Sequence, residues 1–141
     1  MRVVLIACSK KKKRGVHAAA DLYDSPLFRL AFIYAILERF DLRFILSAKY
    51  GLLEPRRPIR SYNRALSKMS KKGRRKWVCE VAGGLREIVP KGSEICILTG
   101  EDYRKELTTE LAGYYEFKVP MQGLSLGNQI RWLNAQITRH R

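Results

Sequence analysis

Three short and almost uninterrupted apolar runs constrain the fold more than any other feature of this chain. They cover residues 2–8 (RVVLIAC), 43–48 (RFILSA) and 94–99 (EICILT). Runs of this kind are typical of strands that are buried on both faces of a sheet. A fourth strand is expected at 115–119. The spacing of apolar residues between the strands predicts helices at about 25–40, 70–89, 102–112 and 125–138.

The alternation of strands and helices predicts a single α/β domain over residues 1–141. Its expected architecture has three layers, with a mostly parallel four-stranded sheet between flanking helices. Ser25, followed by proline, has the residue type of a helix N-cap. The glycine pair at 83–84 is expected to weaken or bend its helix. Trp77 and Trp132 have apolar neighbours at helical spacing and are expected in the core.

Positive charge dominates the chain and is concentrated in two segments. Lys and Arg outnumber Asp and Glu by 28 to 13, so the formal net charge is +15. The segment from Pro55 to Lys76 contains ten basic residues and no acid, and a second basic cluster covers 10–14. Such clusters most often bind the phosphates of nucleic acid; a solvated basic face, or adaptation to a hot or salty cytoplasm, is the alternative. A membrane surface is disfavoured, because no segment combines this charge with a continuous apolar helix face.

The sequence also carries expectations about location. Its longest strictly apolar run, residues 31–37, is far too short to span a bilayer, and the N-terminus lacks the pattern of a secretory signal. Cys8, Cys79 and Cys96 are odd in number, widely spaced and surrounded by apolar residues, so neither a disulfide framework nor a metal-binding pair is expected. We therefore expect a reduced, cytoplasmic protein.

Polar segments follow the expected strands at the places where α/β proteins bind ligands. Ligands of open α/β sheets lie outside the carboxyl ends of the strands. Here those ends are residues 8–10, 47–51, 99–103 and 120–123, which are polar or contain glycine. We expect them to form a nucleic-acid cleft at one edge of the sheet. The glycine motifs of nucleotide triphosphatases and dinucleotide enzymes are absent, and the two histidines are isolated, which disfavours a zinc deaminase or a histidine-based triad.

Lysine is the candidate nucleophile at this edge. Lys49 follows a buried strand beside an aromatic residue and a glycine, while Lys10 and Lys12 are rivals in the same pocket. A lysine that is partly desolvated and crowded by other cations has a lowered pKa, and its amine can attack C1′ of a nucleotide to form a Schiff base. A phosphate contact is the alternative role for each of the three.

A carboxylate is the second expected catalytic group. Asp102, or its neighbour Glu101, would activate water or stabilise the charge that develops when a glycosidic bond breaks; Asp21 is a further candidate. The alternative is that Glu101 and Asp102 are first-turn carboxylates that interact favourably with the helix dipole.

Residues expected to contact nucleic acid carry positive charge, a hydroxyl group or an aromatic ring. Rings in a basic cleft stack on unpaired bases, each contributing roughly 1–3 kcal/mol. Ser9 and Ser47 have backbone capping as an alternative, Tyr23 and Tyr103 have core packing, and Cys8 is expected in the core with a functional role left open. The predicted contacts are Ser9, Lys11, Tyr23, Ser47, Tyr50, Arg56, Arg57, Arg60, Tyr62, Arg64, Lys71, Lys72, Arg74, Arg75 and Tyr103.

Several motifs carry a resemblance to a known family. They are CSKKK at 8–12, ADLYDSPLF at 20–28, ILSAKYGLL at 45–53, LTGEDY at 98–103 and P-x-x-GLSLG-x-x-x-x-WL at 120–133. In order and spacing they resemble the YaaA-like superfamily, and most closely its small stand-alone prokaryotic members. The larger YaaA proteins carry Ser-Pro-Ala-Lys in place of CSKK, and a helix-hairpin-helix insert for DNA that has no counterpart here. The resemblance implies a nucleic-acid-binding α/β fold and a role in protecting DNA from oxidative damage.

Together these observations favour an enzyme that acts on a base within nucleic acid. The most concrete form is a DNA glycosylase for an oxidised base, with or without lyase activity, that extrudes its target base from the duplex. No cofactor and no metal are expected, DNA is favoured over RNA, and a monomer is favoured. The alternatives are a non-catalytic DNA- or RNA-binding protein of oxidative stress, and a modification enzyme for tRNA or 7-deazaguanine-type bases.

Overall fold

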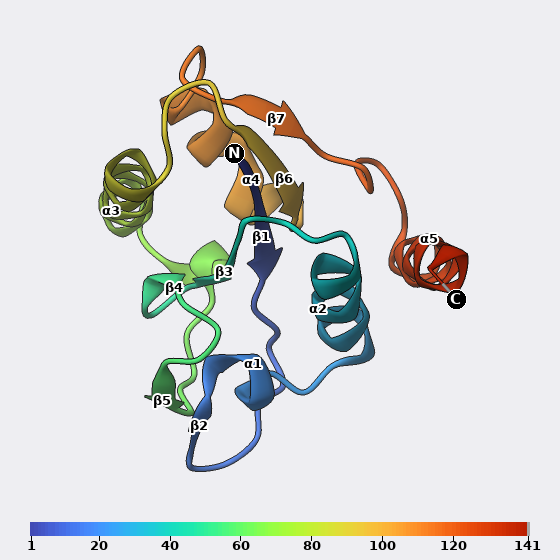
Figure 1. The fold of residues 1–141 in the computed structure, drawn as a ribbon. Coiled ribbons are helices and arrows are strands. Elements are labelled where there is room, and N and C mark those ends of the chain that lie inside the picture. Colours follow the sequence, from blue (N-terminus) through green and yellow to red (C-terminus); the bar gives the residue numbers. More distant parts are fainter. Residues whose placement is uncertain (141) are drawn as a thin grey trace.

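The apolar runs form the centre of one sheet (Figure 1). The computed structural model describes residues 1–140, and the side chain of Asp102 also lies outside the described part. The elements in chain order are β1 (Arg2–Ala7), β2 (Val16–Ala18), α1 (Ala19–Leu22), α2 (Pro26–Leu37), β3 (Leu42–Ser47), β4 (Gly51–Leu53), β5 (Pro58–Arg60), the 3-10 turn η1 (Leu66–Lys68), α3 (Lys71–Ile88), β6 (Glu94–Leu98), α4 (Glu101–Glu110), β7 (Glu116–Lys118) and α5 (Leu126–Arg139).

The main sheet has the strand order β4-β3-β1-β6-β7. β1 pairs in parallel with β3 and β6, so Val4 lies opposite Arg43 on one side and Cys96 on the other. β7 continues the parallel part, whereas β4 folds back antiparallel on β3. The predicted α/β class with a mostly parallel sheet is confirmed. The short edge strand β4 makes the sheet five-stranded and mixed, and the segments expected as loops also contain α1 and the small sheet of β2 and β5.

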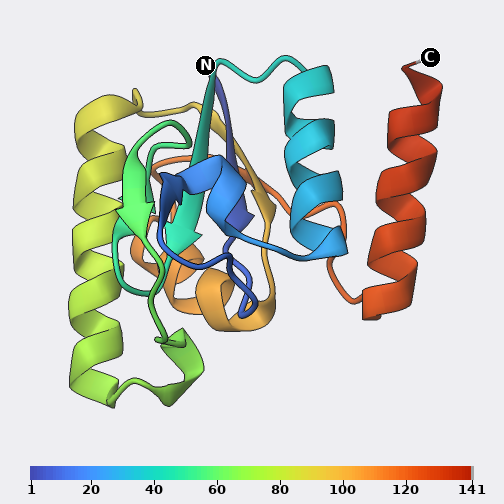
Figure 2. The ribbon, with the colours of Figure 1, turned by 90° about the horizontal axis from the view of Figure 1, so that it is seen from below.

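Helices cover both faces of the sheet (Figures 1 and 2). α3 and α4 pack on one face, where Val3, Leu5 and Ile97 meet Trp77 and Leu107. The other face carries α1 and α2, and α5 packs alongside α2. Residues 3–6 of β1 therefore alternate between two cores, which explains why this part of the strand is entirely apolar.

The longer helices α2 and α3 each begin at a serine that caps the helix N-terminus. The Ser25 hydroxyl accepts a hydrogen bond from the backbone N–H of Phe28 at 3.1 Å, and Ser70 accepts one from Gly73 at 3.0 Å. Such caps satisfy N–H groups that have no partner inside the helix. α3 continues without interruption through the glycine pair that was expected to weaken it. A Cβ on Gly84 would lie 3.3 Å from the Leu52 side chain, so this glycine permits close packing of α3 on β4.

The direction in which successive strands are added across the sheet reverses between the parallel neighbours β1 and β6. From β1 the chain passes through α2 to β3 on one side, whereas from β6 it passes through α4 to β7 on the other. The carboxyl ends of two such strands leave a crevice, which is the usual ligand position in open α/β sheets. Cys8 directly follows β1, and Thr99 and Gly100 directly follow β6.

Two sequence expectations concern location and the cysteines. Among residues 1–140, no helix combines the length and the apolar character needed to cross a bilayer.

The three cysteines are free thiols. Cys96 is buried and Cys8 is half-buried, but Cys79 is exposed on α3, which corrects the expectation that all three have apolar surroundings.

Candidate functional site

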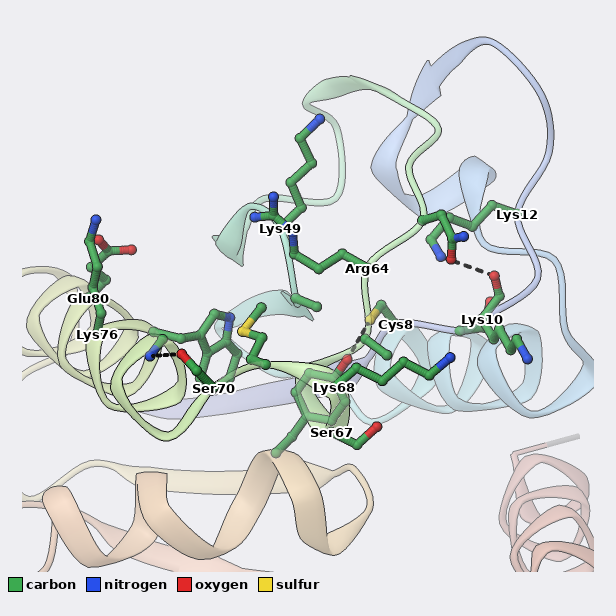
Figure 3. A pocket seen from close by; sticks show the side chains of 18 residues that line it. Cys8, Lys10, Lys12, Lys49, Arg64, Ser67, Lys68, Ser70, Lys76 and Glu80 are labelled. Carbon is green, nitrogen blue, oxygen red and sulfur yellow. Dashed lines mark hydrogen bonds between the residues drawn. The ribbon is translucent and has the colours of Figure 1, made fainter.

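A cleft of about 950 Å³ opens where the carboxyl ends of β1 and β3 meet the start of α3 (Figure 3). Cys8, Ser9 and Lys10 line it after β1, and Ala48 and Lys49 line it after β3. The remaining walls are Lys12, residues 63–65 and 67–70, the first half of α3, and Tyr103 of α4. The segment after β7 does not line it: Met121 lies at a separate cavity. The expected gathering of four strand ends therefore holds for three of them.

The cleft is strongly cationic. Glu80 is the acid that lines it among the described side chains. In Figure 3, Lys10 and Lys12 stand on one side of the cleft, and Lys76 stands on the opposite side. Cations placed on facing walls suit a polyanion that runs between them. The six basic residues are Lys10, Lys12, Lys49, Arg64, Lys68 and Lys76.

One face of α3 forms a wall of the cleft. Lys76 and Trp77 come three and four residues after Gly73, and Glu80 comes three and four residues after them, so the four line one side of the helix. The Trp77 indole N–H donates a hydrogen bond to the backbone carbonyl of Ser47 at 2.8 Å, and Trp77 is only 5% exposed. This bond attaches the α3 wall to the end of β3.

A side-chain contact crosses the crevice between β1 and β6. The Cys8 sulfur lies 3.1 Å from the Tyr103 hydroxyl, within hydrogen-bond distance. Tyr103 also packs edge-on against Trp77, with ring centroids 5.6 Å apart. The end of β1 is thereby joined to α4 and to the α3 wall.

Tyrosines form a hydrogen-bonded cluster behind the loop that follows β1. The Tyr62 hydroxyl lies 2.8 Å from the Tyr23 hydroxyl and 2.8 Å from Ser47 Oγ. Ser47 Oγ also accepts from the Tyr50 backbone N–H, and the rings of Tyr50 and Tyr62 meet edge-on. Burial raises the pKa of Tyr62 well above its usual value, and it raises the pKa of Tyr23 to about 12.

Lys12 rests on this cluster. Its Nζ stands 4.4 Å from the centroid of the Tyr62 ring, and it donates a hydrogen bond to the Lys10 carbonyl at 3.0 Å. Burial lowers the pKa of Lys12, while the neighbouring Cys8 acts in the opposite sense. A desolvated lysine releases its proton more readily than an exposed one, so its amine is the better nucleophile.

The tyrosine cluster predicts an alkaline loss of stability. Tyr23 keeps its proton to about pH 12 when folded, but titrates near pH 10 when unfolded. Ionisation of this phenol should therefore lower the free energy of unfolding by about 2–3 kcal/mol between pH 10 and 12, with no such loss below pH 10. Tyr23→Phe should cost about 1 kcal/mol at pH 8, by loss of one hydrogen bond, and should be as stable as the parent or more stable at pH 12. Urea unfolding at both pH values measures this, and an equal cost at both would contradict it.

The predicted catalytic residues have different environments. Lys49 lines the cleft, but it is exposed and its ammonium points away from Cys8 (Figure 3), so the desolvation expected for it is found at Lys12 instead. Lys10 also lines the cleft and is exposed. Asp102 is the second residue of α4, and the predicted role of its side chain falls outside the described part. Glu101 and Asp21 are exposed, and neither lines the cleft.

The predicted nucleic-acid contacts divide into two groups. Ser9, Arg64 and Tyr103 line the cleft. The others lie outside it: exposed on β5 and the turn before it, at the start of α3, in the tyrosine cluster, or at the neighbouring cavity. These others are Lys11, Tyr23, Ser47, Tyr50, Arg56, Arg57, Arg60, Tyr62, Lys71, Lys72, Arg74 and Arg75.

Four of the predicted contacts have structural partners that change their role. Arg74 pairs with Glu106 of α4 at 3.3 Å, and Arg75 pairs with Glu110 at 2.9 Å, so both join α3 to α4. Ser47 is fully buried and Tyr23 is 2% exposed. The prediction that Ser47 and Tyr23 contact nucleic acid directly is therefore wrong, because a ligand cannot reach buried side chains. Both are instead within hydrogen-bond distance of the Tyr62 hydroxyl, and the Tyr62 ring in turn packs under the Lys12 amine.

The structure adds residues that the sequence reasoning did not select. Lys68 and Lys76 line the cleft although both were left out of the predicted contacts, and the acidic Glu80 lines it too. Helical spacing from Trp77 could have found Glu80, three residues further on, because the buried tryptophan fixes which face of α3 points inward. Lys68 is the last residue of η1, a turn too short to leave a periodic signal.

Metal ligands are sparse in this region. Of the side chains that the structure describes, no three His, Cys, Asp or Glu residues are grouped so as to hold a metal ion. The donors available in the cleft are amines, guanidinium groups and hydroxyls, which suit phosphate oxygens.

Comparison with models of protein families relates the chain to one of them. A family model described as "Family of unknown function (DUF6884)" matches residues 3–135, which is nearly the whole chain. No curated protein matches the chain. The resemblance to the YaaA-like superfamily stays a prediction. By this match the chain belongs to DUF6884, a family of unknown function.

Proposed function

We propose that this protein is an enzyme that acts on a base within DNA, with Lys12 as its nucleophile. The observation that carries the proposal is the position of Lys12. It is the lysine whose pKa burial lowers, and it stands in a cleft lined by five other cations. The cations bind phosphates, and the amine is the reactive group.

The reaction is the release of a base through a Schiff base. The neutral Lys12 amine attacks C1′, and the bond from C1′ to the base breaks with its electron pair going to the base. The base takes up one proton, and the new C–N ammonium loses one. The nitrogen lone pair then forms a C=N bond as the C1′–O4′ bond breaks, and O4′ keeps the electron pair of that bond and takes up a proton, which gives the protonated imine. Loss of a C2′ proton then breaks the C3′–O bond, which is the lyase step.

An oxidised base is the proposed target, because the family resemblance implies protection of DNA from oxidative damage. The phosphates on either side of the extruded nucleotide would lie against the two cationic walls of the cleft. Extrusion is least costly for a damaged or mismatched base, which favours repair over reaction at intact pairs.

A trapping experiment tests this function. Purified protein in excess is incubated with labelled DNA duplexes, each carrying one oxidised or deaminated base, in the presence of cyanoborohydride. The expected result is a covalent protein–DNA product with one class of lesion, and, in a parallel reaction without the reductant, strand cleavage without alkali. Cleavage that needs alkali and gives no covalent product would contradict the lysine mechanism.

Two further outcomes would contradict the enzyme proposal as a whole. If every duplex stays intact while binding is tight and salt-sensitive, the protein is a non-catalytic binding module. If the protein binds tRNA tightly and is indifferent to damaged DNA, a role in RNA base modification replaces the proposal.

A further inference from the structure

A second cavity, of about 440 Å³, lies behind the loop that follows β1, between the start of α2 and α5. Its walls are mainly apolar, and they include Leu27, Phe28, Leu98, Met121 and Ile130. The cavity therefore contrasts in character with the cationic cleft. Lys10 and Lys11 are the charged residues among its lining.

The two compartments share one wall. Cys8, Ser9 and Lys10 line both the cleft and the apolar cavity. The Lys12 amine donates a hydrogen bond to the backbone carbonyl of Lys10, so it lies beside this wall. Cys8 is held there by its contact with Tyr103. A ligand that occupies both compartments has to cross the wall close to the amine.

We propose that the apolar cavity holds the base of a nucleotide whose phosphates lie in the cationic cleft. This inference rests on the proposed function and adds the base subsite to it. A nucleotide has a flat, largely apolar ring at one end and phosphates at the other, which matches the two compartments. Its sugar would then lie at the shared wall, where C1′ comes near Lys12.

Competing positions for the base are occupied by protein. The rings of Tyr23 and Tyr62 pack edge-on against each other with centroids 6.4 Å apart, and Tyr23 is buried. Both hydroxyls are also hydrogen-bonded. The cavity between α2 and α5 is open by comparison, and Phe28 and Met121 offer surfaces against which a base can pack.

The lining also sets how the base is read. The Ser25 hydroxyl accepts from Phe28 N–H, and the Ser9 hydroxyl donates to the Lys11 carbonyl. Few polar groups are thus left to bind the edges of a base. A mainly apolar site distinguishes ligands by size and shape, with differences of about 10–200-fold. The subsite is therefore expected to accept several related bases rather than one.

Filling the cavity tests the inference. The probes are a short oligothymidylate and a tetrahydrofuran strand of the same length and charge that has no bases. The parent protein should bind the base-bearing strand about tenfold more tightly, because contact with a base contributes at this level. Ile130→Trp should remove that difference and leave affinity for the baseless strand unchanged.

Matched variants separate filling from misfolding. Leu126 also lines the cavity and is 61% exposed, so Leu126→Trp should fold and should give the same loss. Ile33 lies on α2 away from the cavity and is 44% exposed, so Ile33→Trp should behave as the parent does. If both filling variants keep the tenfold preference, or weaken both strands equally, the subsite is wrong.

The same proteins distinguish failure of the inference from failure of the proposed function. Preserved covalent trapping in Ile130→Trp, with preserved base preference, overturns the subsite and leaves the enzyme intact. Loss of base preference without any trapping by the parent supports the subsite and overturns the Schiff-base mechanism.

Discussion

Replacing Lys12 with alanine is expected to abolish the covalent protein–DNA product, with DNA affinity reduced no more than about tenfold. Lys12 is the lysine whose pKa burial lowers, and removal of its amine removes the nucleophile. One lost phosphate contact has a limited effect on affinity when five other cations line the cleft. Lys12→Arg should also abolish trapping while it keeps the positive charge, which separates nucleophilic chemistry from phosphate binding.

Lys49→Ala is the matched control for this prediction. Lys49 lines the same cleft but is exposed, so its loss should leave trapping intact. The rate of trapping should rise with pH and reach a plateau at a pH below the ordinary pKa of a lysine side chain. The reason is that only the neutral amine reacts and that the pKa of Lys12 is lowered. Trapping by Lys12→Ala at the parent rate would contradict the assignment, and its loss in Lys49→Ala would move the nucleophile there.

Reversing three charges in the cleft should weaken DNA binding by about 100-fold or more at moderate salt. Arg64, Lys68 and Lys76 are exposed cations that line the cleft, and they come from its outer segment and from α3. Each lost phosphate contact should also reduce the slope of log affinity against log salt by about 0.9. The triple variant Arg64→Glu, Lys68→Glu and Lys76→Glu should therefore show a slope smaller by about 3 in a salt titration of binding.

A second triple variant controls for net charge. Lys91, Lys105 and Arg139 are exposed and do not line the cleft, and their replacement by glutamate lowers the formal charge of +15 by the same amount. It should weaken binding much less and leave the salt slope nearly unchanged. Equal losses in the two variants would show that DNA responds to overall charge and not to the cleft.

The main elements of the fold were predictable because each has a strong local signal. The four predicted strands and four longer helices are present, with ends shifted by a few residues. Short elements have no such signal. β2 and β5 have three residues each and a single buried side chain between them, and α1 has four residues, so no apolar period can form. Their positions depend on pairing with each other and with the core.

The location of the site was predictable from the sequence, but the roles of its individual residues were not. The carboxyl ends of buried strands indicated the region, and Lys12 was among the candidates. Its desolvation depends on Tyr62, fifty residues away, and the separation of Arg74 from Lys76 depends on which face of α3 meets α4. Such facts come from packing between distant segments, and no local pattern contains them.

The indole bond between Trp77 and Ser47 gives the protein an intrinsic optical reporter. The sequence contains two tryptophans, and Trp77 lines the cleft. Trp132 instead packs edge-on against Tyr34 on the opposite face of the sheet, with centroids 5.3 Å apart. In a protein with Trp132→Phe, all tryptophan emission would come from the cleft wall. Occupancy of the cleft could then be followed by fluorescence, without a label on either partner.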